Sequence, residues 1–195
     1  MVKDVNTIEL SYPRFVDING RFGLDQAMLG RDWSKYYVAR SCALSALGNC
    51  ILYSLGKYTL SEEEALEFFN KLMQVLRPMP WGVPSIRRLN QALQRLEKYL
   101  GQGFQIKIHR GKNYGPEAFN FIFQNLQENR PILLLNTNHP KRGFQNHWVT
   151  ITGLLFEEGK YFVYFSSWGK RYKMLFEDLL TDQTIFRRMG VLERK

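Results

Sequence analysis

The sequence contains two cysteines, Cys42 and Cys50, and both lie in one apolar stretch. Residues 39–55 are mostly small or apolar and contain no proline, and Gly56 follows them, which predicts a buried helix. The eight residues that separate the cysteines would rise about 12 Å along a helix, roughly twice the Cα separation that a disulfide tolerates. The two thiols are therefore predicted to be free, as suits a reducing compartment.

A metal site is the next chemistry that cysteines could serve. It would need further ligands, and the three histidines, His109, His139 and His147, show neither zinc-finger nor HExxH spacing. We therefore expect no metal and no other cofactor. Each thiol is left with a packing role or a role as a nucleophile.

The two cysteines differ in their place along the predicted helix. Cys42 stands at its start, two residues after Arg40, where the positive potential and free N–H groups of a helix N-terminus favour a thiolate and can hold an oxyanion. Cys50 lies two turns further on, between Leu47 and Leu55, as a small core residue would. Cys42 is the candidate nucleophile, and simple burial of its thiol is the alternative.

A candidate general base comes from the second half of the chain. In "QNHWVTITGLL", His147 begins an apolar strand directly after a polar loop, where a rigid sheet would hold it at the edge of a cleft. The next predicted strand ends in "YFSSWGK", so Ser166 and Ser167 could orient the imidazole and Trp168 could cover it. The alternative is an ordinary surface histidine at a strand end.

The elements that must position these residues change character halfway along the chain. A capping box at Ser61 and Glu64, apolar residues at helical spacing, Gly101 as a stop and Pro116 in a first turn predict helices in the first half. Runs rich in β-branched and aromatic residues predict strands in the second half. The predicted helices are 39–55, 59–76, 83–101 and 115–129, and the predicted strands are 104–109, 131–136, 147–156, 160–166 and 184–193.

This order of elements predicts an α+β fold. We expect one domain over residues 1–195, because no repeat, low-complexity segment or linker divides it. Its helical lobe would cover about residues 30–130 and would pack on an antiparallel sheet lobe of about residues 104–193.

Composition limits the classes of protein. Hydrophobic residues make up 45% of the chain and charged residues 23%, as in soluble globular proteins. The first fifteen residues show no secretory signal, and no apolar run is long enough to cross a membrane, so a cytoplasmic protein without a membrane partner is expected.

The net charge of +9 permits an acidic or nucleic-acid partner. The basic residues are dispersed and accompany no recognition motif, so nucleic acid is an unlikely partner and the charge is read mainly as solvated surface. Two basic pairs lie near the candidate site in sequence, Lys141 and Arg142 before His147, and Lys170 and Arg171 after Trp168. They are candidate contacts for acidic substrates, with ordinary exposed charge as the alternative.

Three short blocks together resemble the papain-like cysteine peptidase superfamily, in particular its C39-like branch. They are "SCALSALGNCILYSLG" around Cys42, "NHWVTITG" around His147 and "FSSWGK" around Ser166. Their order matches that of the superfamily, and helices before sheet is its layout. The resemblance implies a papain-like fold, with Cys42 as nucleophile, His147 as base and Ser166 at the position of the orienting Asn or Asp.

The sequence departs from the pattern of that superfamily at three places. Serine replaces the orienting Asn or Asp, and residues Ala43 and Leu44 follow the cysteine where glycine and a small residue or proline are usual. The stretch "DWSKYYVARSC" lacks the glutamine that serves the oxyanion hole in the family, so Ser34, Tyr36 or a backbone N–H would have to serve.

The function implied is thiol-dependent acyl transfer on a peptide or amide substrate, most simply as a peptidase or amidase. An acyltransferase of a biosynthetic pathway is one alternative. The other is a catalytically silent papain-like binding protein, which the departures above favour. The oligomeric state is left open.

Overall fold

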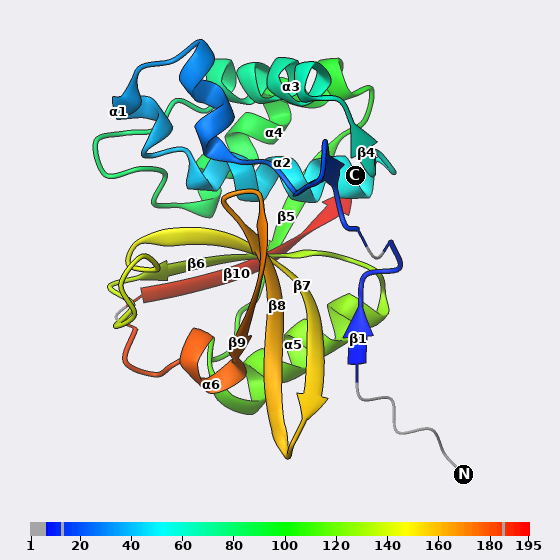
Figure 1. Cartoon of the computed structure of the whole chain (residues 1–195), viewed down its shortest axis with the longest axis vertical. Helices are drawn as coiled ribbons and strands as arrows, with labels where there is room; N and C mark the ends of the chain where they lie inside the picture. The colour runs from blue at the N-terminus through cyan, green and yellow to red at the C-terminus, as the bar shows by residue number, and fades with distance from the viewer. Residues whose placement is uncertain (1–6, 13, 185) are drawn as a thin grey trace.

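The computed structural model of the chain describes residues 7–12, 14–184 and 186–195. The first six residues of the expected domain, Pro13 and Ile185 lie outside this description. Helices gather at one end of the molecule and the large sheet with its covering helices at the other, as Figure 1 shows. The predicted α+β arrangement, with a helical lobe before an antiparallel sheet lobe, is confirmed.

The centre of the helical lobe is α2 (Cys42–Ser54), which is buried from Ala43 to Tyr53. A helix that is apolar on all sides must be covered on all sides. The helix α3 (Glu62–Val75) packs on one face of α2, and strand β7 (His147–Glu157) packs on another. The predicted buried helix is therefore present, and Cys42 is its first residue.

The other long helices of this lobe begin and end at the signals in the sequence. Ser61 accepts a hydrogen bond from the backbone N–H of Glu64, whose carboxylate accepts one from the N–H of Ser61, so the capping box of α3 is confirmed. Helix α4 (Ile86–Leu100) begins after Ser85 and ends at Gly101, which adopts φ +67°. Such a left-handed end favours glycine, because a side chain would strain the backbone there.

The large sheet is antiparallel throughout. Its strands follow the order β5-β10-β6-β7-β8-β9, and β1 (Thr7–Glu9) pairs with the far half of β7. The remaining strands are β5 (Phe104–Ile108), β6 (Ile132–Thr137), β8 (Lys160–Ser167), β9 (Lys170–Leu175) and β10 (Phe186–Arg194). All five predicted strands are present, and β1 and β9 are additions to this sheet.

Helix α5 (Gly115–Gln127) corrects the predicted extent of the helical lobe. The expectation of about 30–130 placed this segment with the helices, but α5 packs against strands β1, β6 and β7. It covers the sheet away from the helical end in Figure 1, as does the short α6 (Phe176–Leu179). The spacing of apolar residues in α5 indicated a helix, but it did not indicate which surface of the protein the helix covers.

Several short elements carried no clear signal in the sequence. They are strands β2 (Asp17–Ile18), β3 (Arg21–Phe22) and β4 (Thr59–Leu60), which form a small separate sheet, the 3-10 helix η1 (Gln26–Arg31) and helix α1 (Lys35–Val38). The 3-10 helix η1 packs against α2 and α3, and β4 packs against α3. Elements η1 and α1 immediately precede the helix that begins at Cys42.

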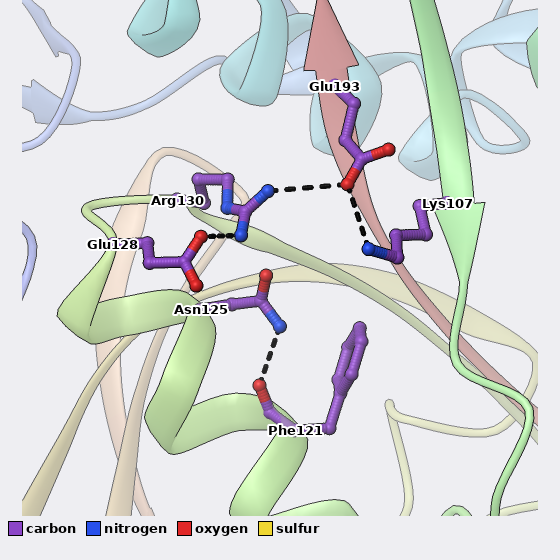
Figure 2. Close-up of polar contacts among 6 residues, drawn as sticks. All are labelled: Lys107, Phe121, Asn125, Glu128, Arg130 and Glu193. Carbon is purple, nitrogen blue, oxygen red and sulfur yellow. Dashed lines mark hydrogen bonds and ion pairs between the residues drawn. The ribbon is translucent and has the colours of Figure 1, made fainter.

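Polar contacts tie the C-terminal end of α5 to the sheet, as Figure 2 shows. Arg130 pairs with Glu128 and, at 3.4 Å, with Glu193 of β10, which also pairs with Lys107 of β5 at 3.2 Å. These side chains are partly or well exposed, so each pair contributes little to stability. Their effect is to fix the chain between α5 and β6.

No helix in the described parts of the chain combines the length and the apolarity needed to cross a membrane.

Candidate active site

The first turn of α2 has backbone N–H groups that its N-cap does not use. Ser41 occupies the N-cap position, but its hydroxyl donates to the carbonyl of Tyr37 at 2.7 Å and makes no capping bond. The first N–H groups of a helix have no partner within the helix. Here they remain available to the side chain of Cys42 or to a ligand.

Two opposing effects act on the thiol of Cys42, which is half-buried. Burial raises the pKa of Cys42 above its ordinary value, whereas hydrogen bonds from the backbone N–H groups of Trp148, Ala43 and Cys42 itself lower the pKa. Burial has the larger effect, so the neutral thiol is favoured, against the thiolate that helix position alone suggested. The N–H of Trp148 places the thiol beside the peptide group that follows His147.

Cys50 is fully buried, and burial raises the pKa of its thiol strongly. Its thiol lies beside Thr150, whose hydroxyl donates to the carbonyl of Ala46 at 3.2 Å. This environment is that of a core residue.

His147 is the first residue of β7, and its side chain is buried. Its Nε2 lies 2.7 Å from the hydroxyl oxygen of Ser167, at the end of β8. When Nε2–H donates to that hydroxyl, the lone pair of the neutral ring is on Nδ1 and is able to accept a proton. Burial lowers the pKa of His147 to about 4, which also favours the neutral ring.

The expectation that Ser166 orients this ring is wrong by one residue. Thr150 pairs with Ser166 across strands β7 and β8, so these two side chains lie on the same face of the sheet. His147 is three residues before Thr150 and therefore points to the opposite face, as does Ser167. The alternation of side chains thus brings His147 together with Ser167.

Ser166 instead holds a segment of the helical lobe against the sheet. Its hydroxyl donates to the carbonyl of Phe22 at 2.7 Å and accepts from Nδ2 of Asn49 at 3.3 Å. The side-chain oxygen of Asn49 accepts the N–H of Leu24 at 2.7 Å. Between these contacts lies Gly23 at φ +85°, where a Cβ would come within 2.6 Å of the Ser166 hydroxyl.

Trp168 covers the ring of His147. The two rings are stacked with their centroids 4.3 Å apart and their planes inclined by 16°. Trp168 adopts φ +48° and Gly169 φ +66°, and together they form the two-residue turn between β8 and β9. A tryptophan in the left-handed region is uncommon, and such strained positions concentrate at functional sites. The ring of Phe144, from the loop before β7, also contacts Trp168.

These side chains enclose a cavity of about 10 Å³, close to the space of one water molecule. Its lining residues come from both lobes and are Gln26, Cys42, Ser45, Ala46, Asn49, His147, Trp148, Ser166, Ser167 and Trp168. Cys42 and His147 therefore line the same small cavity. A substrate carbonyl needs more room, so the cavity must widen for any reaction.

Gln26 is the site residue that sequence reasoning missed. It is the first residue of η1 and stands sixteen positions before Cys42, outside the stretch in which a glutamine was sought. The candidates named for its role lie elsewhere, because neither Ser34 nor Tyr36 lines the cavity. Ser34 is the N-cap residue of α1, and Tyr36 is 44% exposed with its ring against Arg40.

The four basic residues proposed for substrate binding are exposed and do not line the cavity. Lys141 and Arg142 lie in the loop before β7. Lys170 and Arg171 begin β9, where Arg171 pairs with Glu9 at 2.7 Å. Their contribution to substrate binding stays a prediction.

Within the residues that the structure describes, no three His, Cys, Asp or Glu side chains gather in a way that could hold a metal ion. His139 is buried by the fold instead. Its Nδ1 accepts the N–H of Lys141 at 3.1 Å, so its Nε2 donates to the carbonyl of Asp178 at 2.9 Å. This histidine fixes the loop that leads to His147.

Comparison with known proteins shows the fold. A solved structure of digestive procathepsin L 3 from the larval midgut of Tenebrio molitor matches 97% of this chain and 69% of that chain, with a TM-score of 0.50 and 10% sequence identity. No family model matches the sequence. No curated protein matches it either. The chain therefore has the papain-like fold predicted from its three blocks.

The contacts of the two serines predict different outcomes for their substitution. If His147 acts as a base, Ser167→Ala should lower kcat about 3- to 30-fold, because Nε2 loses the partner that fixes the ring. Ser167→Thr, which retains a hydroxyl, should keep most of the activity. Ser166→Ala should mainly cost stability, about 1 kcal/mol. Equal kcat losses for both alanine variants would contradict this assignment.

The low pKa of His147 predicts a specific loss of stability in acid. The unfolded chain binds a proton at this residue near pH 6.5 and the folded chain only near pH 4. Stability from this group is therefore complete above about pH 6.5 and falls as the pH drops towards 4, by about 3 kcal/mol in all. Urea unfolding at pH 4.5 and pH 7.5 measures it, and His147→Gln should reduce the difference. An unchanged difference in that variant would assign the acid sensitivity to other groups.

Proposed function

We propose that this protein is a cysteine-dependent acyl-transfer enzyme acting on peptide or amide substrates, most simply a peptidase. The observation that carries the proposal is the shared cavity, which is lined both by Cys42 at an uncapped helix start and by His147. The papain-like fold supports this proposal, and the blocks around Cys42, His147 and Ser166 follow the order that the resemblance implies.

The reaction would begin with a neutral pair. The imidazole of His147 takes the thiol proton as the sulfur of Cys42 attacks the substrate carbonyl carbon. The carbonyl oxygen becomes an oxyanion, and the imidazolium then donates its proton to the leaving amine as the C–N bond breaks. Water or an amine next attacks the thioester, again with His147 as base, and frees the thiol.

Stabilisation of the oxyanion would come from the start of α2. The backbone N–H of Cys42 and the side-chain amide of Gln26 would serve as the donors, since both residues line the cavity. Two donors aimed at the developing charge are the usual arrangement for acyl transfer. Gln26 thus takes the role that was sought at Ser34 and Tyr36.

The proposal also covers the branch of the superfamily, which we take to be C39-like, and the reaction that removes the acyl group from Cys42. The block around Cys42 resembles C39-like peptidases, which supports hydrolysis of a peptide. Transfer of the acyl group to an amine in a biosynthetic pathway is the second candidate, because the same thioester can serve both reactions. Burial that favours a neutral thiol and a cavity of about 10 Å³ favour the third, a silent binding protein.

One experiment separates these candidates. The protein is mixed with a panel of peptide p-nitrophenyl esters, and intact-protein mass spectrometry follows acyl adducts with and without an added amine such as glycinamide. An adduct on Cys42 that decays in water supports the peptidase, and faster decay with the amine appearing in the product supports the acyltransferase. Absence of any adduct on Cys42, with the enzyme folded, would reject both enzymatic readings.

A further inference from the structure

The loop between α3 and α4 presents the most exposed large apolar side chain on the described surface. Trp81 is 66% exposed, whereas most tryptophan surface is normally buried. It stands in a tight turn in which the N–H of Met79 donates to the carbonyl of Gly82 at 3.0 Å and the reverse bond measures 2.8 Å. Tryptophan, tyrosine and arginine are enriched among the residues that dominate binding energies, so an exposed tryptophan held by a tight turn is a candidate anchor for a ligand.

Hydrogen bonds attach this turn to both sides of the candidate active site. Nε of Arg40, two residues before Cys42, donates to the carbonyl of Pro80 at 2.6 Å. The indole N–H of Trp148, the residue after His147, donates to the carbonyl of Val83 at 2.8 Å. The position of Trp81 is therefore fixed relative to the thiol and to the imidazole.

A positive charge lies beside the turn. The guanidinium of Arg40 stacks on the ring of Tyr36, 4.1 Å from its centroid, and Nη1 donates to the Tyr36 carbonyl at 2.9 Å. Arg40 forms no ion pair with any carboxylate that the structure describes, and its Nη2 donates no hydrogen bond within that part of the chain. An arginine fork with free donors prefers a carboxylate.

We infer that Tyr36, Arg40 and Trp81 form a substrate-recognition site for a peptide segment in which a large apolar side chain stands next to a carboxylate. The apolar side chain packs on Trp81 and Tyr36, and the carboxylate accepts hydrogen bonds from Arg40. The inference rests on the proposed function at one point only: the residues next to this motif in the same peptide would reach Cys42. It assigns recognition to groups on the helical lobe instead of the basic pairs at residues 141–142 and 170–171.

The test measures binding without catalysis. Fluorescence anisotropy follows a fluorescein-labelled pentapeptide containing Phe followed by Asp, with the Cys42→Ala protein as the background for all variants. Trp81→Ala should weaken binding about tenfold, and Arg40→Gln should weaken it several-fold and reduce its salt dependence. Tyr99→Ala and Arg95→Gln are matched controls, since Tyr99 is 47% exposed on α4 and Arg95 likewise donates to a backbone carbonyl.

A second peptide separates direct contact from a loosened turn. With Asn in place of Asp, Arg40→Gln should no longer weaken binding, because the charge that Arg40 contacts is gone. Binding that is undetectable at millimolar peptide, or unchanged in Trp81→Ala, would overturn the inference. So would self-association of the protein through Trp81 without peptide binding. Failure of the ester experiment alone would reject the enzyme and leave this binding site intact.

Discussion

Replacement of Cys42 by alanine is expected to lower acyl-transfer activity by at least about 10³-fold, because the attacking atom is lost and no second thiol can reach the cavity. The fold should remain, with the free energy of unfolding changed by less than about 1 kcal/mol, since Cys42 is only half-buried. Product formation from the most reactive ester, together with urea unfolding, measures both quantities.

Cys50→Ala is the matched control for that variant. Its thiol is fully enclosed in the core, so the substitution should leave kcat unchanged and cost about 1 kcal/mol of stability. Similar behaviour of the two variants in the activity assay would reject Cys42 as the nucleophile. The two alanine variants thus test the different roles of Cys42 and Cys50. The sequence suggested this difference, and the complete burial of Cys50 explains it.

His147→Gln is expected to lower kcat about 10²- to 10⁴-fold, the range usual for loss of a general base. Glutamine can still donate to Ser167 and fit beneath Trp168, but it cannot accept the thiol proton. Activity of the variant should recover in part as the pH rises, because hydroxide then removes that proton. The measurement is a pH–rate profile of both proteins.

A loss of less than tenfold would show that His147 does not act as the base. His139 is not a substitute, because both of its ring nitrogens are already bonded within its own loop and α6. Its Gln variant therefore serves as a control for general effects on the loop before β7. Loss of activity in that control with normal activity in His147→Gln would also contradict the proposal.

The sequence by itself determined the four long helices, α2 to α5, and five strands of the large sheet, and it placed Cys42 near the start of α2. Local signals carry this information, because a capping box, a glycine stop or an apolar periodicity acts within a few residues. For the same reason the sequence distinguished Cys42 at a helix start from Cys50 two turns inside. The papain-like fold also followed, through the resemblance that the three blocks carry together and in order.

Only the tertiary structure decided which side chains complete the site. Whether Ser166 or Ser167 meets His147 depends on the pairing of β7 with β8, and a shift of one residue exchanges the two faces. The place of Gln26 depends on how η1 and α1 fold back onto α2, over sixteen residues without a clear signal. Contacts between residues far apart in the sequence produce no pattern within a few neighbouring residues, so the sequence does not indicate them.

The same limit explains the errors in the lobes and in the electrostatics. The amphipathic pattern of α5 indicated a helix, but only packing shows that its apolar face covers the sheet. Position at a helix start favoured a thiolate at Cys42, whereas burial by residues from both lobes reverses that preference. Desolvation depends on everything that surrounds a group, and those surroundings exist only in the folded chain.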